Sequence, residues 1–114
     1  YKRIIMANTF TNIKVQNVTT GWSAIGSVLN DSTQRTIIGM TIANTTSAVI
    51  AVDVRILNDG TATVIVEAAP VPTGGSLVVI GGDQKLVLVE DDLVQVKSNT
   101  ATSADVVMSM LDIT

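Results

Sequence analysis

Hydrophobic and polar residues alternate most clearly along residues 48–57, which predicts a β-strand with one buried face. Asn58, Asp59 and Gly60 follow this segment, and these residue types tolerate the positive φ that a tight hairpin turn requires. Alternation then resumes over residues 61–68, so the sequence predicts an antiparallel hairpin of 48–57 with 61–68. The side chains expected on the core face of the first strand are Ile50, Val52, Val54 and Ile56.

Short apolar runs separated by turn residues continue through the rest of the chain, and no segment has helical periodicity. Pro70 and Pro72 exclude a central strand between residues 70 and 75, which we expect to be a connecting corner. In the strand that begins near Ile37, the side chains of Ile38, Met40 and Ile42 are expected to share a face. The remaining predicted strands are 13–18, 23–29, 77–80, 85–89, 93–98 and 104–113.

Eight or nine short strands with this spacing predict an all-β fold, namely an antiparallel β-sandwich that is jelly-roll-like. The chain length of 114 residues allows one core. We therefore expect an N-terminal arm over residues 1–12 and a single β-sandwich domain over residues 13–114.

Composition supports the all-β prediction and excludes several functions. Val, Ile and Thr supply 17, 12 and 15 residues, and these β-branched types favour strands. The chain has no Cys and no His, which excludes thiol nucleophiles, disulfides, His-based triads and the usual zinc sites. A net charge of −3 argues against nucleic acid as a partner. No apolar run is long enough for a signal peptide or a membrane span, so we expect no membrane partner and synthesis in the cytoplasm.

Carboxylates are the only sizeable set of reactive groups, and Glu90, Asp91 and Asp92 form their densest cluster. Oxygen ligands in a loop suit Ca²⁺, but this spacing matches no known cation loop. The cluster is therefore interpreted as a solvated turn. Sugar hydrolysis by paired carboxylates is disfavoured because only three aromatic residues are available to form the walls of a cleft. We predict no catalytic residues, no metal site and no cofactor, and hence a protein that is not an enzyme.

The final predicted strand, residues 104–113, is apolar on both faces. Such a strand either lies in the middle of a tightly packed sandwich or packs its second face against another subunit. Charged residues form only 15% of the chain, and interface cores exclude charge, which favours subunit contact. Trp22 is open to two interpretations, as an interface anchor or as a cap on one end of the core. The candidate interface residues are Val49, Val106, Met108, Met110 and Trp22, with residues 1–12 as a tether.

Four stretches of the chain carry a resemblance to a known group of proteins. They are MANTF (Met6–Phe10), IIGMTIANTTS (Ile37–Ser47), APVPTGGSLVVIGGDQKLVL (Ala69–Leu88) and SADVVMSMLDI (Ser103–Ile113). On these stretches the chain resembles small β-sandwich virion structural proteins of tailed bacteriophages. The resemblance implies a repeated subunit of a phage particle, located in the virion and made in the host cytoplasm.

The function expected from these observations is that of a capsid decoration (cement) protein or a head–tail or tail component. Its expected partners are copies of itself and other virion proteins, such as the major capsid protein or a head–tail or tail protein. Under this hypothesis, Met108→Asp should leave the monomer folded and abolish assembly. The alternative is a receptor- or carbohydrate-binding module of a virion fibre, which the shortage of aromatic platforms disfavours.

Overall fold

Residues 8–114, which the computed structural model describes, form nine β-strands and no helix, and therefore contain no helix that could cross a membrane. Most strands follow the predicted turns closely, because the turns contain residues that end the apolar alternation. The predicted strand 23–29 is too long: β2 ends at Ile25, since Gly26 has φ 89° and leaves the extended conformation. Their bounds are β1 (Asn8–Val18), β2 (Ser23–Ile25), β3 (Gln34–Asn44), β4 (Ile50–Asn58), β5 (Thr61–Val71), β6 (Ser76–Ile80), β7 (Leu86–Leu88), β8 (Asp92–Ser98) and β9 (Ala104–Ile113).

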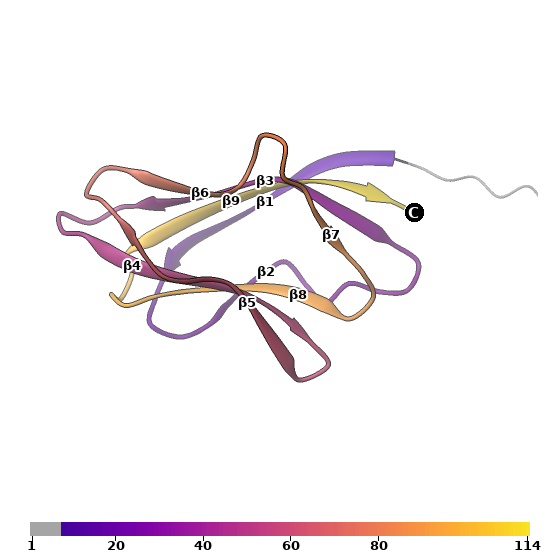
Figure 1. Cartoon of the computed structure of the whole chain (residues 1–114), viewed down its shortest axis with the longest axis horizontal. Coiled ribbons are helices and arrows are strands. Elements are labelled where there is room, and N and C mark those ends of the chain that lie inside the picture. The colour runs from indigo at the N-terminus through magenta and orange to yellow at the C-terminus, as the bar shows by residue number, and fades with distance from the viewer. Residues whose placement is uncertain (1–7) are drawn as a thin grey trace, which may run out of the picture.

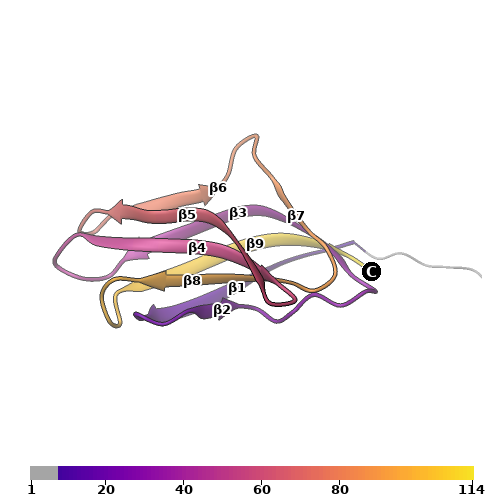
Figure 2. The ribbon, with the colours of Figure 1, turned by 60° about the horizontal axis from the view of Figure 1, so that its bottom comes forward.

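The strands form two antiparallel sheets that pack face to face (Figures 1 and 2). One sheet has the order β1-β9-β3-β6, with β7 paired to β3 beyond the end of β6; the other has the order β2-β8-β4-β5. Most connections cross from one sheet to the other, which gives the jelly-roll arrangement of two interlocked Greek keys. The predicted all-β sandwich is confirmed.

The core lies between the two sheets and consists almost entirely of aliphatic side chains and methionines. Val52, Val54, Val94 and Val96 are fully buried on the inner faces of β4 and β8, as strict alternation along these strands predicts. On the opposite sheet, β3 and β9 supply the facing layer. Since β4, β8, β3 and β9 each have a paired strand on both sides, they form the centre of the molecule.

The predicted hairpin is formed by β4 and β5, with Asn58 paired to Thr61 across a two-residue turn. Asp59 (φ 47°) and Gly60 (φ 86°) both have positive φ, which is the geometry of a type I′ turn. Pro70 lies within β5 instead of in a corner; β5 is the edge strand of its sheet, so the missing N–H of this proline removes no bond to a second neighbour.

The predicted core face of β3 is wrong at one position. The pairing of β3 with β9 shifts between Ile37 and Gly39, and this bulge turns Ile37 into the core in place of Ile38. Met40 and Ile42 are buried as predicted. A bulge inserts one residue into the alternation, and the sequence Ile37-Ile38 is apolar at both positions, so the pattern could not show which of them points inward.

The predicted boundary between an arm and the domain also needs correction. Residues 8–12 pair with Ser109–Ile113 of β9 and form the first part of β1. Their side chains are exposed because this part of the strand extends past the core, so they lack the apolar alternation that marks a half-buried strand. Residues 1–7 of the predicted arm lie outside the described residues.

An ion pair closes one end of the sandwich. Arg35 on β3 lies directly opposite Asp112 on β9, and its guanidinium Nε and Nη2 donate hydrogen bonds of 2.8 and 3.0 Å to the two carboxylate oxygens. Both side chains are mostly buried. Gly26 lies against this pair with φ 89°, and a Cβ at this position would come within 2.8 Å of the Ile13 side chain. Glycine at position 26 therefore lets the chain after β2 close over the end of the core.

Candidate subunit-contact surface

Three of the predicted interface residues belong to the core. Val106, Met108 and Met110 are at most 1% exposed and lie on the inner face of β9, between β1 and β3. They cannot contact another subunit while the domain is folded, so their prediction as surface contacts is wrong. The physical reason is that β9 is a central strand covered by the opposite sheet, which was the other interpretation of its two apolar faces.

The remaining two candidates lie on the surface in different places. Val49 is 61% exposed in the loop that precedes β4. Trp22 is half-buried immediately before β2, and the cationic groups of Arg55 and Lys97 lie 3.9 and 4.8 Å from its ring centroid. Arg55 and Lys97 project from the outer face of the β2-β8-β4-β5 sheet, so Trp22 covers that outer face and does not cap the core. Its role as an interface anchor remains a prediction.

The cation–π contacts of Trp22 give a testable prediction. Each such contact contributes about 0.5–1 kcal/mol near a surface, so loss of both in Trp22→Ala should lower the free energy of unfolding by about 1–2 kcal/mol. Trp22→Phe, which keeps an aromatic face for both cations, should lose less. Urea unfolding followed by circular dichroism measures both. If Trp22→Ala instead abolishes assembly and leaves stability unchanged, the ring is an interface anchor.

The second face of β9 is directed away from the core and is the unusual surface of this molecule. The strand register aligns its side chains with those of neighbouring strands in two rows across the sheet. One row consists of the four residues Phe10, Leu111, Thr36 and Val87, which lie side by side on β1, β9, β3 and β7. The other row consists of Lys14, Val107, Thr41 and Val78 on β1, β9, β3 and β6. We call the surface made by these two rows the β9 face.

Apolar side chains dominate the β9 face and several are well exposed. Phe10 is 73% exposed, and Val78, Val87 and Val107 are exposed by 63%, 61% and 46%. Lys14 and Asp105 are the only charged residues at the outward-facing paired positions of this sheet within residues 8–114. The outer face of an antiparallel sheet is ordinarily polar, and an exposed apolar patch on a folded domain marks a contact site.

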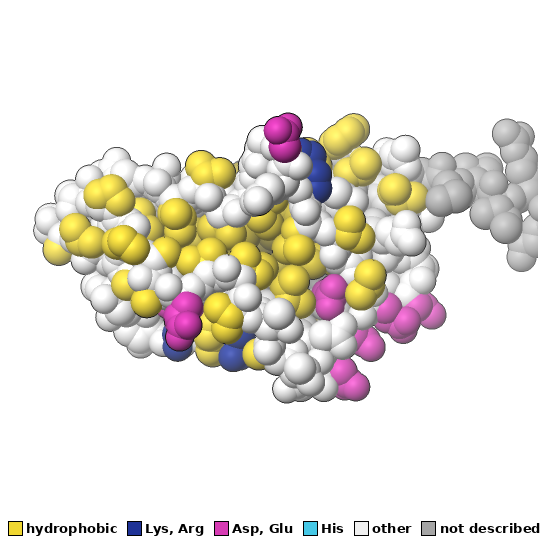
Figure 3. Space-filling model, in the orientation of Figure 1, with side chains coloured by type: hydrophobic (Ala, Val, Ile, Leu, Met, Phe, Trp, Pro, Cys, Tyr) yellow, Lys and Arg dark blue, Asp and Glu magenta, His cyan; other side chains and the backbone are white. Residues whose placement is uncertain are grey.

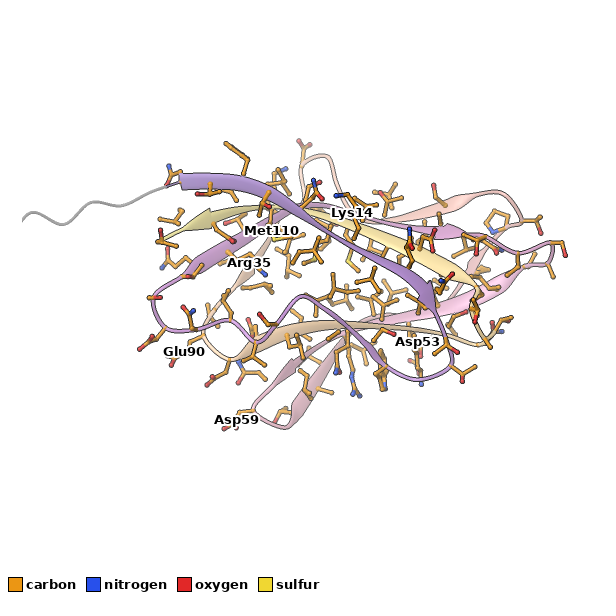
Figure 4. The ribbon with its side chains drawn as sticks, turned by 180° about the vertical axis from the view of Figure 1, so that it is seen from behind. Lys14, Arg35, Asp53, Asp59, Glu90 and Met110 are labelled. Atoms are coloured by element: carbon orange, nitrogen blue, oxygen red, sulfur yellow. The ribbon has the colours of Figure 1, made fainter. Side chains whose placement is uncertain are left out.

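The outer face of the other sheet differs in character. It carries Arg55, Gln95, Lys97 and Asp53, which interact with one another: Arg55 donates a 2.8 Å hydrogen bond to Gln95, and the Lys97 ammonium lies 3.8 Å from the Asp53 carboxylate. Figure 4 shows Asp53 on this sheet and Lys14 on β1. Since interface cores exclude charge, the two faces are not equivalent, and the β9 face is the better contact surface.

Hydrophobic side chains also gather along the side of the molecule between β5 and the strands β6 and β7 (Figure 3). They include Ile65, Val66, Leu77, Val79 and Leu86, which are half-buried and pack against the core. This band is the rim of the core where the two sheets separate. We therefore assign it to folding and not to the contact surface.

In the acidic cluster of Glu90, Asp91 and Asp92, Asp92 has a structural role. Asp92 is nearly buried at the start of β8, where its carboxylate accepts hydrogen bonds from the Asn58 side-chain amide (2.7 Å) and the Val89 N–H (2.9 Å). Asp59 and Glu90 lie at the same end of the molecule (Figure 4). No group of three or more His, Cys, Asp or Glu residues in the described part of the chain is arranged to hold a metal ion.

Sequence reasoning did not single out Val78 and Val87 as exposed residues, and it included Phe10 only as part of the predicted tether of residues 1–12. The signal was present in the runs 77–80 and 86–89, which have no polar alternation. It could not be used from sequence alone, because a continuous apolar strand is equally typical of a core that is covered on both faces.

Comparisons with known proteins identify the fold and no family. No family model matches the chain, and no curated protein sequence matches it. The fold is similar to that of a protein of Bacillus endospore appendages, which form a family of disulfide-linked pili. This similarity has a TM-score of 0.56 at 17% sequence identity and covers 95% of this chain and 86% of the other. At this identity it shows a shared fold alone.

Proposed function

We propose that this protein is a structural subunit that assembles with copies of itself and with partner proteins through the β9 face, without chemical turnover. The observation that carries the proposal is the exposure of Phe10, Val78, Val87 and Val107 on a face with almost no charge. The similarity of fold to an appendage protein is consistent with such a role. The more specific proposal, based on the sequence resemblance, is a virion structural protein of a tailed bacteriophage, either a capsid decoration protein or a head–tail or tail component.

The proposed assembly depends on non-covalent contacts, since the chain has no cysteine and cannot form the disulfide links of those pili. Burying one Val or Phe side chain completely contributes about 1.5–3 kcal/mol. Association costs on the order of 4–15 kcal/mol in lost translational and rotational freedom. Several apolar side chains must therefore be buried together, and the two rows of the β9 face provide them on the outer face of one sheet, on either side of Asn12 and Ser109. A closed symmetry would then repeat the contact for every copy.

The proposal is tested by placing a charge on the β9 face. Val107→Lys should leave the domain folded, because the side chain already points outward, and should reduce the assembled species to smaller ones. Val64→Lys is the matched control: this valine is 57% exposed and projects from the outer face of the other sheet, opposite Arg55. Light scattering coupled to size-exclusion chromatography measures the mass of each variant, and circular dichroism checks the fold.

Two outcomes would overturn the proposal. The first is a wild-type protein that remains monomeric at all accessible concentrations and does not bind phage particles that lack it. The second is a Val107→Lys variant that assembles as well as Val64→Lys. Specific binding of a glycan by the folded protein would instead favour the receptor- or carbohydrate-binding role.

A further inference from the structure

The two sheets have four edges, and one of them differs from the rest. β1 is an edge strand of eleven residues that pairs only with β9 within residues 8–114. Eight consecutive pairs, from Asn8 with Ile113 to Val15 with Val106, form without an irregularity. This segment has no proline and no glycine, and Lys14 is its only charged residue. A long, regular edge of this kind presents unpaired backbone N–H and C=O groups to another strand.

The other three edges are protected in ways that prevent pairing. β2 has three residues. β6 and β7 are two short strands interrupted by residues 81–85. β5 is as long as β1, but its pairing with β4 has two irregularities, Ala68 has φ 49°, and Pro70 lacks an N–H. Short strands, bulges and prolines are the features by which natural sheets avoid edge-to-edge association.

We infer that β1 pairs edge to edge with β1 of a second copy in antiparallel orientation, so that the two β9-face sheets join into one continuous sheet. A second copy is the occupant because β1 is the one edge in the described chain open to such pairing, and hence its partner strand in another copy is also β1. The two-fold symmetry of this contact closes it, which makes the product a dimer and not a fibre. The inference rests on the proposed function in one respect, namely that the chain self-associates.

The side chains of β1 favour a particular register. Pairing centred on Asn12 places Lys14 directly opposite Phe10 of the second copy on the outer face. The ammonium group of Lys14 would then contact the ring of Phe10, the most exposed large hydrophobic residue among those described. This register also aligns the row that begins with Phe10 in one copy with the row that begins with Lys14 in the other. The two β9 faces would form one extended apolar surface.

The absence of native cysteines permits a direct test by disulfide trapping. In the inferred dimer, Asn12 lies opposite itself on the two-fold axis, within the Cα separation that a disulfide requires. Asn12→Cys should therefore be recovered mostly as a covalent dimer after mild oxidation. Lys14→Cys is the matched control on the same face of the same strand. Two copies of residue 14 would lie about 13 Å apart along the strands, so this variant should remain monomeric on a denaturing gel.

A mixture of the Phe10→Cys and Lys14→Cys variants should form the covalent heterodimer that the register requires. The inference is overturned if Asn12→Cys gives no covalent dimer while the wild type still assembles, an outcome that leaves the proposed function intact. Equal cross-linking by Asn12→Cys and Lys14→Cys also overturns it. A monomeric wild type, together with no covalent dimer from Asn12→Cys, overturns both proposals. A covalent Asn12→Cys dimer that forms nothing larger and binds no partner supports β1 pairing and contradicts the β9-face role.

Discussion

Met108→Asp is expected to unfold this protein. The Met108 side chain has no exposed surface and lies on the inner face of the central strand β9, opposite Ile13 on β1 and Met40 on β3. Truncating a buried methionine costs about 2–5 kcal/mol, and an unpaired buried carboxylate adds several more. Small domains are stable by about 5–15 kcal/mol, so the sum is comparable to the whole free energy of unfolding.

The neighbouring residue provides the control for this prediction. Val107 points to the opposite face and is 46% exposed, so Val107→Asp should retain a cooperative unfolding transition close to that of the wild type. Met108→Leu conserves volume and should cost less than about 1.5 kcal/mol. Circular dichroism and urea unfolding distinguish the three variants. A folded Met108→Asp monomer would show that this position is on the surface, as the pattern of the sequence first suggested.

Asn44→Ala is expected to have the second largest effect, a loss of about 2–4 kcal/mol in the free energy of unfolding. Asn44 is buried at the end of β3, where its side-chain amide donates hydrogen bonds to the carbonyl oxygens of Ala48 (2.8 Å) and Val71 (3.0 Å). Its Oδ1 accepts bonds from the Thr46 N–H (2.9 Å) and hydroxyl (2.8 Å). The substitution removes the partner of the buried Val71 carbonyl and of the Thr46 N–H, whereas the Thr46 hydroxyl keeps its 2.9 Å hydrogen bond to the Ala48 carbonyl.

A matched control exists in the same chain. Asn30 forms the same local pattern, because its Oδ1 accepts hydrogen bonds from the N–H and the hydroxyl of Ser32. Asn30 is exposed, however, and within residues 8–114 its side-chain amide donates no hydrogen bond to another strand. Water can replace those bonds, so Asn30→Ala should cost less than about 1 kcal/mol. Urea unfolding of both variants compares them. Equal losses would mean that the contacts of Asn44 with Ala48 and Val71 contribute nothing to stability.

Local sequence patterns predicted most of the strands and turns, because these elements depend on interactions between residues that are close together in the sequence. The turn at Asn58–Gly60 requires positive φ, and the alternation along 48–57 requires one buried face, so the β4–β5 hairpin could be predicted from a few neighbouring residues. Prediction failed at Ile37 and at residues 8–12. The bulge in β3 and the extension of β1 past the core both depend on pairing with β9, which is distant in the sequence.

The sequence by itself determined an all-β sandwich, the positions of its turns, and the absence of the residues that thiol and histidine chemistry need. It also showed that β9 is apolar on both faces. Only the tertiary structure decided which face is which: Val106, Met108 and Met110 pack against the opposite sheet, and Val107 and Leu111 join the outward rows with Phe10, Val78 and Val87. The physical reason is that alternation fixes which residues share a face, whereas the direction of that face is set by the sheet that packs against it.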